Sequence, residues 1–292
     1  MMKWNGVLRT LMLMMLPAVS VTAWGQVEEI DCQIVDRFDD TLWDVYGGFT
    51  DEVAGDGFRN LGIIEAGAGT WIYYDRTRFG EFDLNLRVDS LFFTGRGVPR
   101  LPEHLTATRL DLEYTVRMPG YTALRLGVAP GLYSELHHVG SDHLFVPFRV
   151  HGVYAPTLDA SILAGVNVYP GFDQLIDPRV GIRWEMMDNF LLDLFYPKSE
   201  IAYRADRGLG ARVGVEMREY LEYRLRSSDE RKGLTINEYR AFAGVDYTAR
   251  NGFRLMVLGG YAFDRELEFR NVAGKLSLDD AWFFRVGSGG AL

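Results

Sequence analysis

The sequence predicts an all-β protein, a closed antiparallel up-and-down transmembrane β-barrel of about twelve strands, within a range of ten to fourteen. Three observations predict this fold. Apolar and polar residues alternate along most of the chain after residue 80, the connections between the alternating segments are short and long in turn, and a signal-like segment precedes them.

Residues 1–25 have the features of a signal peptide. Lys3 and Arg9 make the start basic, and residues 11–21 form an apolar run that is too short to span a bilayer as a helix. The segment 23–25, Ala-Trp-Gly, offers small residues at the two positions that a signal peptidase recognises. We therefore expect a signal-peptide helix, export, and cleavage after residue 25.

The next part of the chain lacks a clear period. Residues 26–68 are acidic, rich in glycine and poorly periodic, and we expect an irregular mature N-terminal extension there. Its single cysteine, Cys32, has no partner for an internal disulfide. The barrel is then expected over residues 69–292, with Trp71–Tyr74 as an additional strand candidate.

The strands are predicted from a period of two. Within residues 109–128, Leu110, Leu112 and Tyr114 alternate with Asp111 and Glu113, which is typical of a strand with one apolar and one charged face. The same pattern recurs in twelve segments: 81–93, 105–117, 121–132, 143–154, 159–168, 177–187, 189–196, 199–204, 209–226, 235–248, 252–264 and 276–288.

The connections between these segments alternate in length. Short turns are expected at 118–120, 155–158, 188–189 and 250–252, and longer polar links at 94–104, 131–142, 169–177, 227–233 and 265–275. Outer-membrane barrels have short periplasmic turns and long outside loops, so this alternation favours a barrel over a soluble β-sandwich.

The polar face of the strands carries charges of both signs, with far more arginine than lysine. Because the planar guanidinium group pairs well with carboxylates, we expect a packed, partly dehydrated lumen. The lumen-lining candidates are Arg87, Arg109, Asp111, Glu113, Arg117, Arg125, Arg149, Arg183, Glu185, Arg212, Glu216, Arg218, Arg240, Asp246 and Arg254.

Aromatic residues gather near the ends of the predicted strands, as expected where lipid meets water. The candidates for contact with the lipid interface beside the short turns are Tyr121, Tyr154, Phe190, Tyr247 and Phe253.

Four stretches carry a resemblance to a known family: APGLYSEL (129–136), DPRVGIRWEMMDNFLLDLFYPKSEIAYR (177–204), GYAFDRELEF (260–269) and LSLDDAWFFRVG (276–287). Over roughly residues 80–292 the chain resembles an uncharacterised family of bacterial outer-membrane β-barrels, a domain of unknown function. The resemblance implies a barrel in the outer membrane and no particular reaction.

Few residues suggest chemistry. His137, His138 and His143 share a loop with Glu135 and Asp142, which is compatible with a weak surface metal site, but we expect solvated loop residues instead. No cofactor motif is present, and we assign no catalytic residue. A lipid hydrolase would need His151 to meet a serine, such as Ser161 or Ser90, and an acid at the lipid-facing rim.

The expected function is therefore structural, or passive permeation of small solutes through a narrow, charged lumen. The arginine excess of the lumen favours anionic solutes, although the whole chain has a formal net charge of -9 that argues against nucleic acid as a partner. The expected location is the outer membrane of a Gram-negative cell envelope, and the expected partners are its lipid and the barrel-assembly machinery. An outer-membrane lipid hydrolase and a soluble exported ligand-binding β protein are the alternatives.

Overall fold

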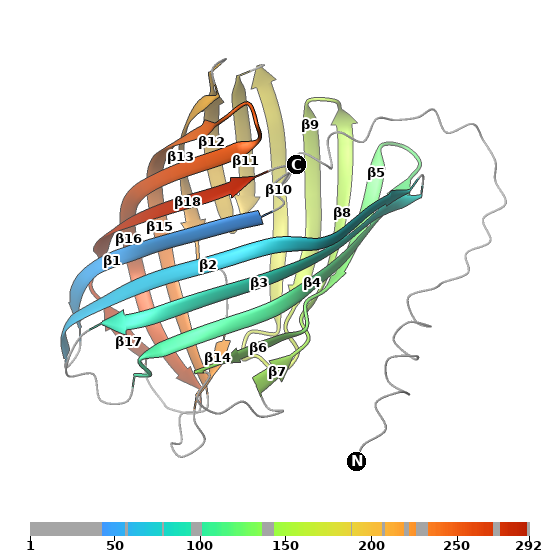
Figure 1. The fold of residues 1–292 in the computed structure, drawn as a ribbon. Helices are drawn as coiled ribbons and strands as arrows, with labels where there is room; N and C mark the ends of the chain where they lie inside the picture. Colours follow the sequence, from blue (N-terminus) through green and yellow to red (C-terminus); the bar gives the residue numbers. More distant parts are fainter. Residues whose placement is uncertain are drawn as a thin grey trace, which may run out of the picture. The chain divides into compact units, whose positions relative to one another are not determined.

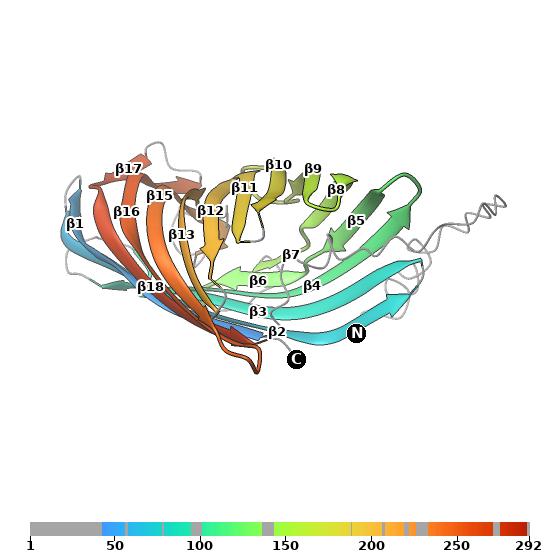
Figure 2. The ribbon, with the colours of Figure 1, turned by 90° about the horizontal axis from the view of Figure 1, so that it is seen from above.

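The described residues form β-strands that close into one antiparallel barrel (Figures 1 and 2). The computed structural model describes residues 43–55, 58–77, 79–94, 101–135, 143–187, 189–205, 208–218, 222–225, 233–270 and 275–290. The predicted signal segment and Cys32 lie outside these residues. Within them, no helix is long and apolar enough to cross a membrane.

The strand segments have the following bounds: β1 Trp43–Gly55, β2 Phe58–Thr77, β3 Gly80–Thr94, β4 His104–Met118, β5 Thr122–Val128, β6 Gly131–Ser134, β7 Leu144–Phe145, β8 Phe148–Thr157, β9 Ala160–Val168, β10 Ile176–Met187, β11 Phe190–Tyr196, β12 Lys198–Arg204, β13 Leu209–Met217, β14 Glu222–Arg224, β15 Gly233–Thr248, β16 Phe253–Arg270, β17 Lys275–Leu278 and β18 Ala281–Gly290.

These segments make a barrel of 14 strands, because four of the strands consist of two segments each. β5 and β6 form one strand, because both pair with β4 in one continuous register. In the same way β7 and β8 form the next strand and pair with β6 and β5. β13 and β14 form one strand that pairs with β15, and β17 and β18 form one that pairs with β16. Pro130 and Pro147 stand at two of the breaks, where the missing N–H interrupts the ladder. The barrel closes because β1 pairs with both β2 and β18.

The strand count lies at the upper end of the predicted range, and the two strands beyond the predicted twelve are β1 and β2. The expectation of an irregular extension is wrong for the described part of 26–68. Glycine conceals the alternation there for a packing reason. A Cβ atom on Gly67 would lie 2.2 Å from the ring of its cross-strand neighbour Tyr46, and one on Gly69 would lie 2.5 Å from the carboxylate of Asp44. The glycines make room for larger side chains, so composition suggested a loop where a strand exists.

The two ends of the barrel differ, as the connection lengths predicted. We call the end with the short turns, at 78–79, 119–121, 158–159, 188–189, 205–208 and 249–252, the turn end. The opposite end, with connections 95–103, 135–143, 169–175, 225–232 and 271–274, is the loop end. Two loop-end connections are short: residues 56–57, and Pro197 between β11 and β12.

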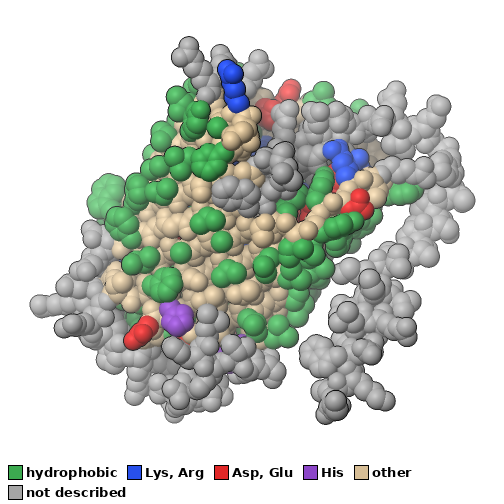
Figure 3. Space-filling view, in the orientation of Figure 1, with side chains coloured by type: hydrophobic (Ala, Val, Ile, Leu, Met, Phe, Trp, Pro, Cys, Tyr) green, Lys and Arg blue, Asp and Glu red, His purple; other side chains and the backbone are tan. Residues whose placement is uncertain are grey.

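The outer and inner faces of the wall are chemically different. Outward side chains are mostly large and apolar, for example Phe49, Leu126, Ile182, Val213 and Trp282, all exposed. Figure 3 shows hydrophobic side chains spread over one outer face, with charged side chains only near its margins. The alternation in the sequence thus separates an apolar outside from a polar inside.

Candidate functional site

The charged side chains predicted for the lumen all lie on the inner face of the wall. None of the fifteen is exposed on the outside, and Arg240 and Asp246 are fully buried. The period-two pattern places them inside because their immediate neighbours along each strand face outward.

One group of these charges lies on β4, β5 and β8. Arg125 Nε is 2.9 Å from Glu113 Oε1, and Arg149 Nε is 2.9 Å from Glu113 Oε2. Arg149 Nη2 also reaches Asp111 Oδ1 at 3.3 Å, and Arg109 Nε lies 3.3 Å from Asp111 Oδ2. Two carboxylates therefore hold three guanidinium groups against this part of the wall.

A second group lies on β12, β13, β15 and β16. Arg212 donates to Asp246 Oδ1 at 3.0 Å and to Glu200 Oε1 at 3.3 Å. Lys198 Nζ lies 2.9 Å from Glu200 Oε2, and Arg254 Nη2 lies 3.5 Å from Asp246 Oδ2. Arg212 thus connects two carboxylates, each of which also holds a second cation.

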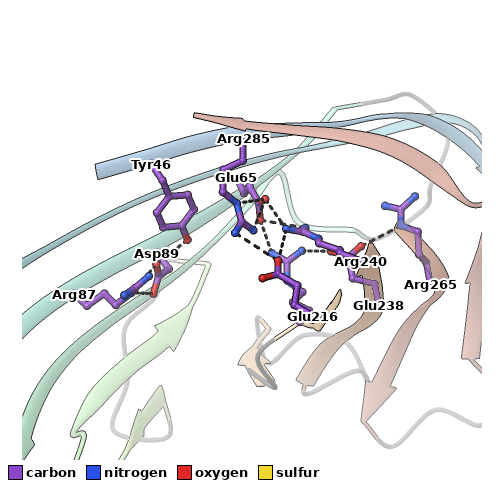
Figure 4. A network of polar contacts seen from close by, with 10 residues as sticks. Tyr46, Glu65, Arg87, Asp89, Glu216, Glu238, Arg240, Arg265 and Arg285 are labelled. Atoms are coloured by element: carbon purple, nitrogen blue, oxygen red, sulfur yellow. Dashed lines mark hydrogen bonds and ion pairs between the residues drawn. The ribbon is translucent and has the colours of Figure 1, made fainter. Parts of the chain in front are cut away.

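The third group among the described residues is an arginine–glutamate network, most of which is labelled in Figure 4: Glu65, Glu216, Glu238, Arg218, Arg240, Arg265 and Arg285. Glu65, on β2, accepts from Arg240 Nη1 at 2.8 Å, from Arg285 Nη2 at 3.1 Å and from Arg218 Nη2 at 3.3 Å. Arg285 Nη1 lies 3.5 Å from Glu216 Oε1. One carboxylate therefore ties β2 to β15, β18 and the residue that follows β13.

Glu238 is the second centre of this network. It accepts from Arg218 Nη1 at 2.8 Å, from Arg265 Nε at 3.1 Å and from Arg240. Its side chain has no exposed surface, and the Arg240 guanidinium stands 5.0 Å from the ring centre of Phe283. Bidentate and shared pairing of this kind suits the planar guanidinium group.

Glu65, Glu238, Arg265 and Arg285 are absent from the predicted lumen set. Glu238 is in phase with Arg240 and Asp246 in its predicted strand. Arg285 alternates with the exposed apolar residues Phe284 and Val286. The alternation itself could therefore have found both. Arg265 could not be found in this way. Asp264 has a positive φ of 49°, and the register between β15 and β16 shifts beside it, which moves the following odd-numbered residues to the inside.

A cavity of about 700 Å³ lies inside the barrel beside this network, and we call it the chamber. It extends from Ser288 and Gly289, near the turn end, to Leu91 and Tyr223. Its charged lining residues are Asp44, Glu65, Arg87, Asp89, Arg179, Lys198, Glu216, Arg218, Arg240, Arg254 and Arg285.

Three cations that line the chamber, Arg87, Lys198 and Arg254, are more exposed than the acids that pair with them, whereas Arg240 is covered. The exposed fractions of the side chains are 32% for Arg87 against 10% for Asp89, 31% for Arg254 against 5% for Asp246, and 47% for Lys198 against 9% for Glu200. In these three pairs the carboxylate lies behind the cation, and the cation faces the chamber. At these positions a solute in the chamber therefore meets more positive than negative charge.

At the loop end the interior is apolar. One contact cluster, which we call the apolar layer, fills it; its members are Leu61, Ile63, Leu91, Leu105, Ala107, Tyr133, Phe145, Tyr169, Phe172, Tyr223, Leu225, Leu234, Ile236, Leu267, Phe269, Leu278 and Ala281. β14 also pairs in parallel with β6, although β6 lies beside β4 and β14 lies beside β15, which are not neighbours in the wall. Figure 2 shows β6 and β7 between the wall of β2–β4 and the wall of β9–β11. The described residues thus place an apolar layer across the chamber's loop end.

The five aromatic residues predicted for the lipid interface, Tyr121, Tyr154, Phe190, Tyr247 and Phe253, are all exposed on the outer side near the turn end. The structure adds Phe79 and Tyr203 at the same level, and the rings of Phe190 and Tyr203 lie 4.9 Å apart.

The residues considered for a hydrolase do not come together. His151 faces inward, is buried, and has its Nε2 atom 3.0 Å from the Asn167 amide. Ser90 contacts Thr106 on β4, and Ser161 lies opposite Arg183, four residues along β9 from Gly165, the partner of His151. Among the described residues, no group of three or more metal-ligating side chains is arranged to hold an ion; His137 and His138 lie outside them.

A family model called "Domain of unknown function (DUF6268)" matches residues 93–277, which is more than half of the chain and runs from the end of β3 to β17. The chain belongs to this family. The closed β-barrel formed by its strands is the fold that the sequence resemblance implied.

Solved structures similar to this DUF6268 protein include a KdgM porin, with 12% identity over 86% of this chain and 99% of that chain, and a TM-score of 0.37. A TodX monoaromatic hydrocarbon channel has 9% identity over 86% and 89%, and a TM-score of 0.48. An outer membrane channel from Pseudomonas putida F1 has 10% identity over 84% and 93%, and a TM-score of 0.44. The search of curated proteins gave no match.

Proposed function

We propose that this DUF6268 protein is an outer-membrane channel for small anionic solutes, with the chamber as its selective part. Export by a cleaved signal in residues 1–25, and insertion by the barrel-assembly machinery, belong to the same proposal.

The outer face supports a membrane location. Large apolar side chains cover the outside of strands all around the barrel, and a soluble exported β protein would expose all of them to water. In the part of the chain that the structure describes, the sheet closes on itself through the β1–β18 pairing, which is the condition for a β structure in hydrocarbon. Exposed aromatic residues near the turn end are suited to the boundary between lipid and water.

The proposed preference for anions is supported by the greater exposure of three cations than of the acids that pair with them. Arg87, Lys198 and Arg254 present charge to the chamber, while their acid partners are nearly covered. An entering anion meets guanidinium and ammonium donors without displacing the pairs behind them, whereas an entering cation finds few accessible carboxylates. The volume of about 700 Å³ suits small organic solutes.

The test is the reversal potential of refolded protein lacking residues 1–25 in a planar bilayer under a salt gradient. We expect anion selectivity. Changing Lys198→Gln and Arg254→Gln together should reduce the selectivity, because two exposed charges leave the chamber. Glu200 and Asp246 both remain paired with Arg212, so the wall should stay folded.

Lys275→Gln is the matched control, since Lys275 is an exposed lysine on β17 that pairs with Glu266 outside the chamber. It should leave the reversal potential unchanged. Cation selectivity would contradict the proposal, and so would a folded barrel that stays silent even when its loop end has been opened by substitution.

A further inference from the structure

The connection between β9 and β10 turns into the barrel. Residues 169–175 are closed at their base, where Tyr169 N donates to Leu175 O at 2.8 Å and Val168 pairs with Ile176. Tyr169 and Phe172 are both 5% exposed and belong to the apolar layer. The tip of a surface connection is thus buried inside the loop end.

Phe172 packs among aromatic rings from two other segments. Its ring centre lies 4.6 Å from that of Phe145 on β7, 5.4 Å from that of Tyr133 on β6, and 5.4 Å from that of Tyr169. Gly171 lets the chain approach closely, because it has a φ of 90° and a Cβ there would lie 3.0 Å from the Phe145 ring. The apolar layer therefore depends on where this connection sits.

A polar latch holds the connection in place from another part of the wall. Arg270, the last residue of β16, has its Nε atom 2.7 Å from Asp173 Oδ1 and donates from Nη1 to Gly171 O at 2.7 Å. Glu222 on β14 accepts from Asp173 N at 2.7 Å and from Arg270 Nη1 at 3.1 Å. β14 and β16 do not neighbour β9 or β10 in the sheet, so the three contacts made to Gly171 and Asp173 join segments that are not adjacent in the wall.

The connection 169–175 can move more easily than the strands of the wall. The β9–β10 ladder ends at Val168 and Ile176, so residues 169–175 can leave the interior without breaking a strand pairing. Ions do not cross a dry apolar constriction readily, because they lose hydration there without gaining partners. Withdrawal of Phe172 would remove the ring that packs between Tyr133 and Phe145.

We propose that residues 169–175 are the gate of the channel, with Phe172 as the barrier and Arg270, Asp173 and Glu222 as the latch that keeps it closed. This inference rests on the proposed function, because a gate has meaning only if the chamber conducts.

The experiment compares open probability in planar bilayers for wild type, Arg270→Asp and Phe172→Ala, each first checked for heat-modifiable gel mobility as evidence of a folded barrel. Arg270→Asp places a third acid beside Asp173 and Glu222, and we expect open probability to rise roughly tenfold or more, since charge-assisted hydrogen bonds are lost. Phe172→Ala should also raise it, because the barrier ring is gone.

A charge swap separates the latch from a general loss of packing. Arg270→Asp combined with Asp173→Arg restores an arginine near two acids, and we expect the open probability to return toward that of wild type. Lys275→Gln and Phe92→Ala are matched controls at the same end, because they change an exposed lysine and an outward aromatic residue that lie outside the apolar layer. Both should behave as wild type.

The outcomes distinguish the two proposals. Equal anion-selective conductance in wild type and in both single variants would overturn the gate and leave the channel intact. A charge swap that opens as much as Arg270→Asp would overturn the latch. Silence of every folded variant would overturn the channel, and the gate with it.

Discussion

At the scale of single residues, the interior is organised by carboxylates that each hold several guanidinium groups. Glu238 contacts Arg218, Arg240 and Arg265 and has no exposed surface, so its charge is compensated entirely by protein groups. Removing one member of such a set lowers the free energy of unfolding by more than the whole set contributes to it, because the remaining charges stay buried without compensation.

Glu238→Gln keeps the size of the side chain and removes its charge. We expect the free energy of unfolding to fall by about 3–5 kcal/mol, because Arg240 and Arg265, which are fully buried, and Arg218, which is mostly covered, lose a shared partner. Urea unfolding of the refolded barrel measures this. Glu266→Gln is the control, since the Glu266–Lys275 pair is exposed and its loss should cost at most about 1 kcal/mol. Equal stability of the two variants would show that the network is not needed for stability.

At the scale of elements, the strands pack tightly where glycine faces inward. Gly259 and Gly260 are neighbours on β16 that point to opposite sides of the wall. A Cβ on Gly260 would lie 2.1 Å from Ala241 O and 2.7 Å from the Phe283 ring, whereas one on Gly259 would have nothing closer than 3.9 Å. Backbone oxygen cannot move aside without disturbing the ladder between β15 and β16.

Gly260→Ala should therefore destabilise the barrel by about 1–3 kcal/mol through overpacking, and Gly259→Ala should be close to neutral. Urea midpoints of the two variants, measured in the same detergent, give the comparison. A tolerated Gly260→Ala would mean that β15 and β16 can separate at this point.

At the scale of the whole molecule, the barrel is turned inside out relative to a soluble protein, with charges within and apolar side chains outside. If the outer face lies in hydrocarbon, a charge placed on it must be buried in lipid. If the outer face were in water, the same charge would be harmless.

Val213 lies at the middle of β13 and is 54% exposed on the outer face. We expect Val213→Arg to destabilise the protein in phospholipid bilayers by about 2–4 kcal/mol, as an arginine near the bilayer midplane does. Leu158→Arg, in the exposed turn between β8 and β9, should cost about 0–1 kcal/mol because it lies near the interface. Equal tolerance at both positions would contradict the membrane location.

Much of this arrangement follows from local pattern. The twelve predicted segments correspond to the strands from β3 to β18, because a period of two is readable within one strand and assigns a face to each of its residues. The pattern failed where packing, not polarity, selected the residue. Gly67 and Gly69 accommodate Tyr46 and Asp44 across the β1–β2 pair, and that partnership is invisible in a single segment.

By itself, the sequence determined the alternating strands, the order of short and long connections and the charged inner face, since each depends on residues close together in the chain. Only the tertiary structure decided which charges meet and where the apolar layer lies. Glu65 reaches Arg285 across 220 positions, the bulge at Asp264 reverses which residues face inward, and Phe172 enters an apolar layer built from most of the chain. These features depend on closure of the barrel, which brings distant segments together and which no local period encodes.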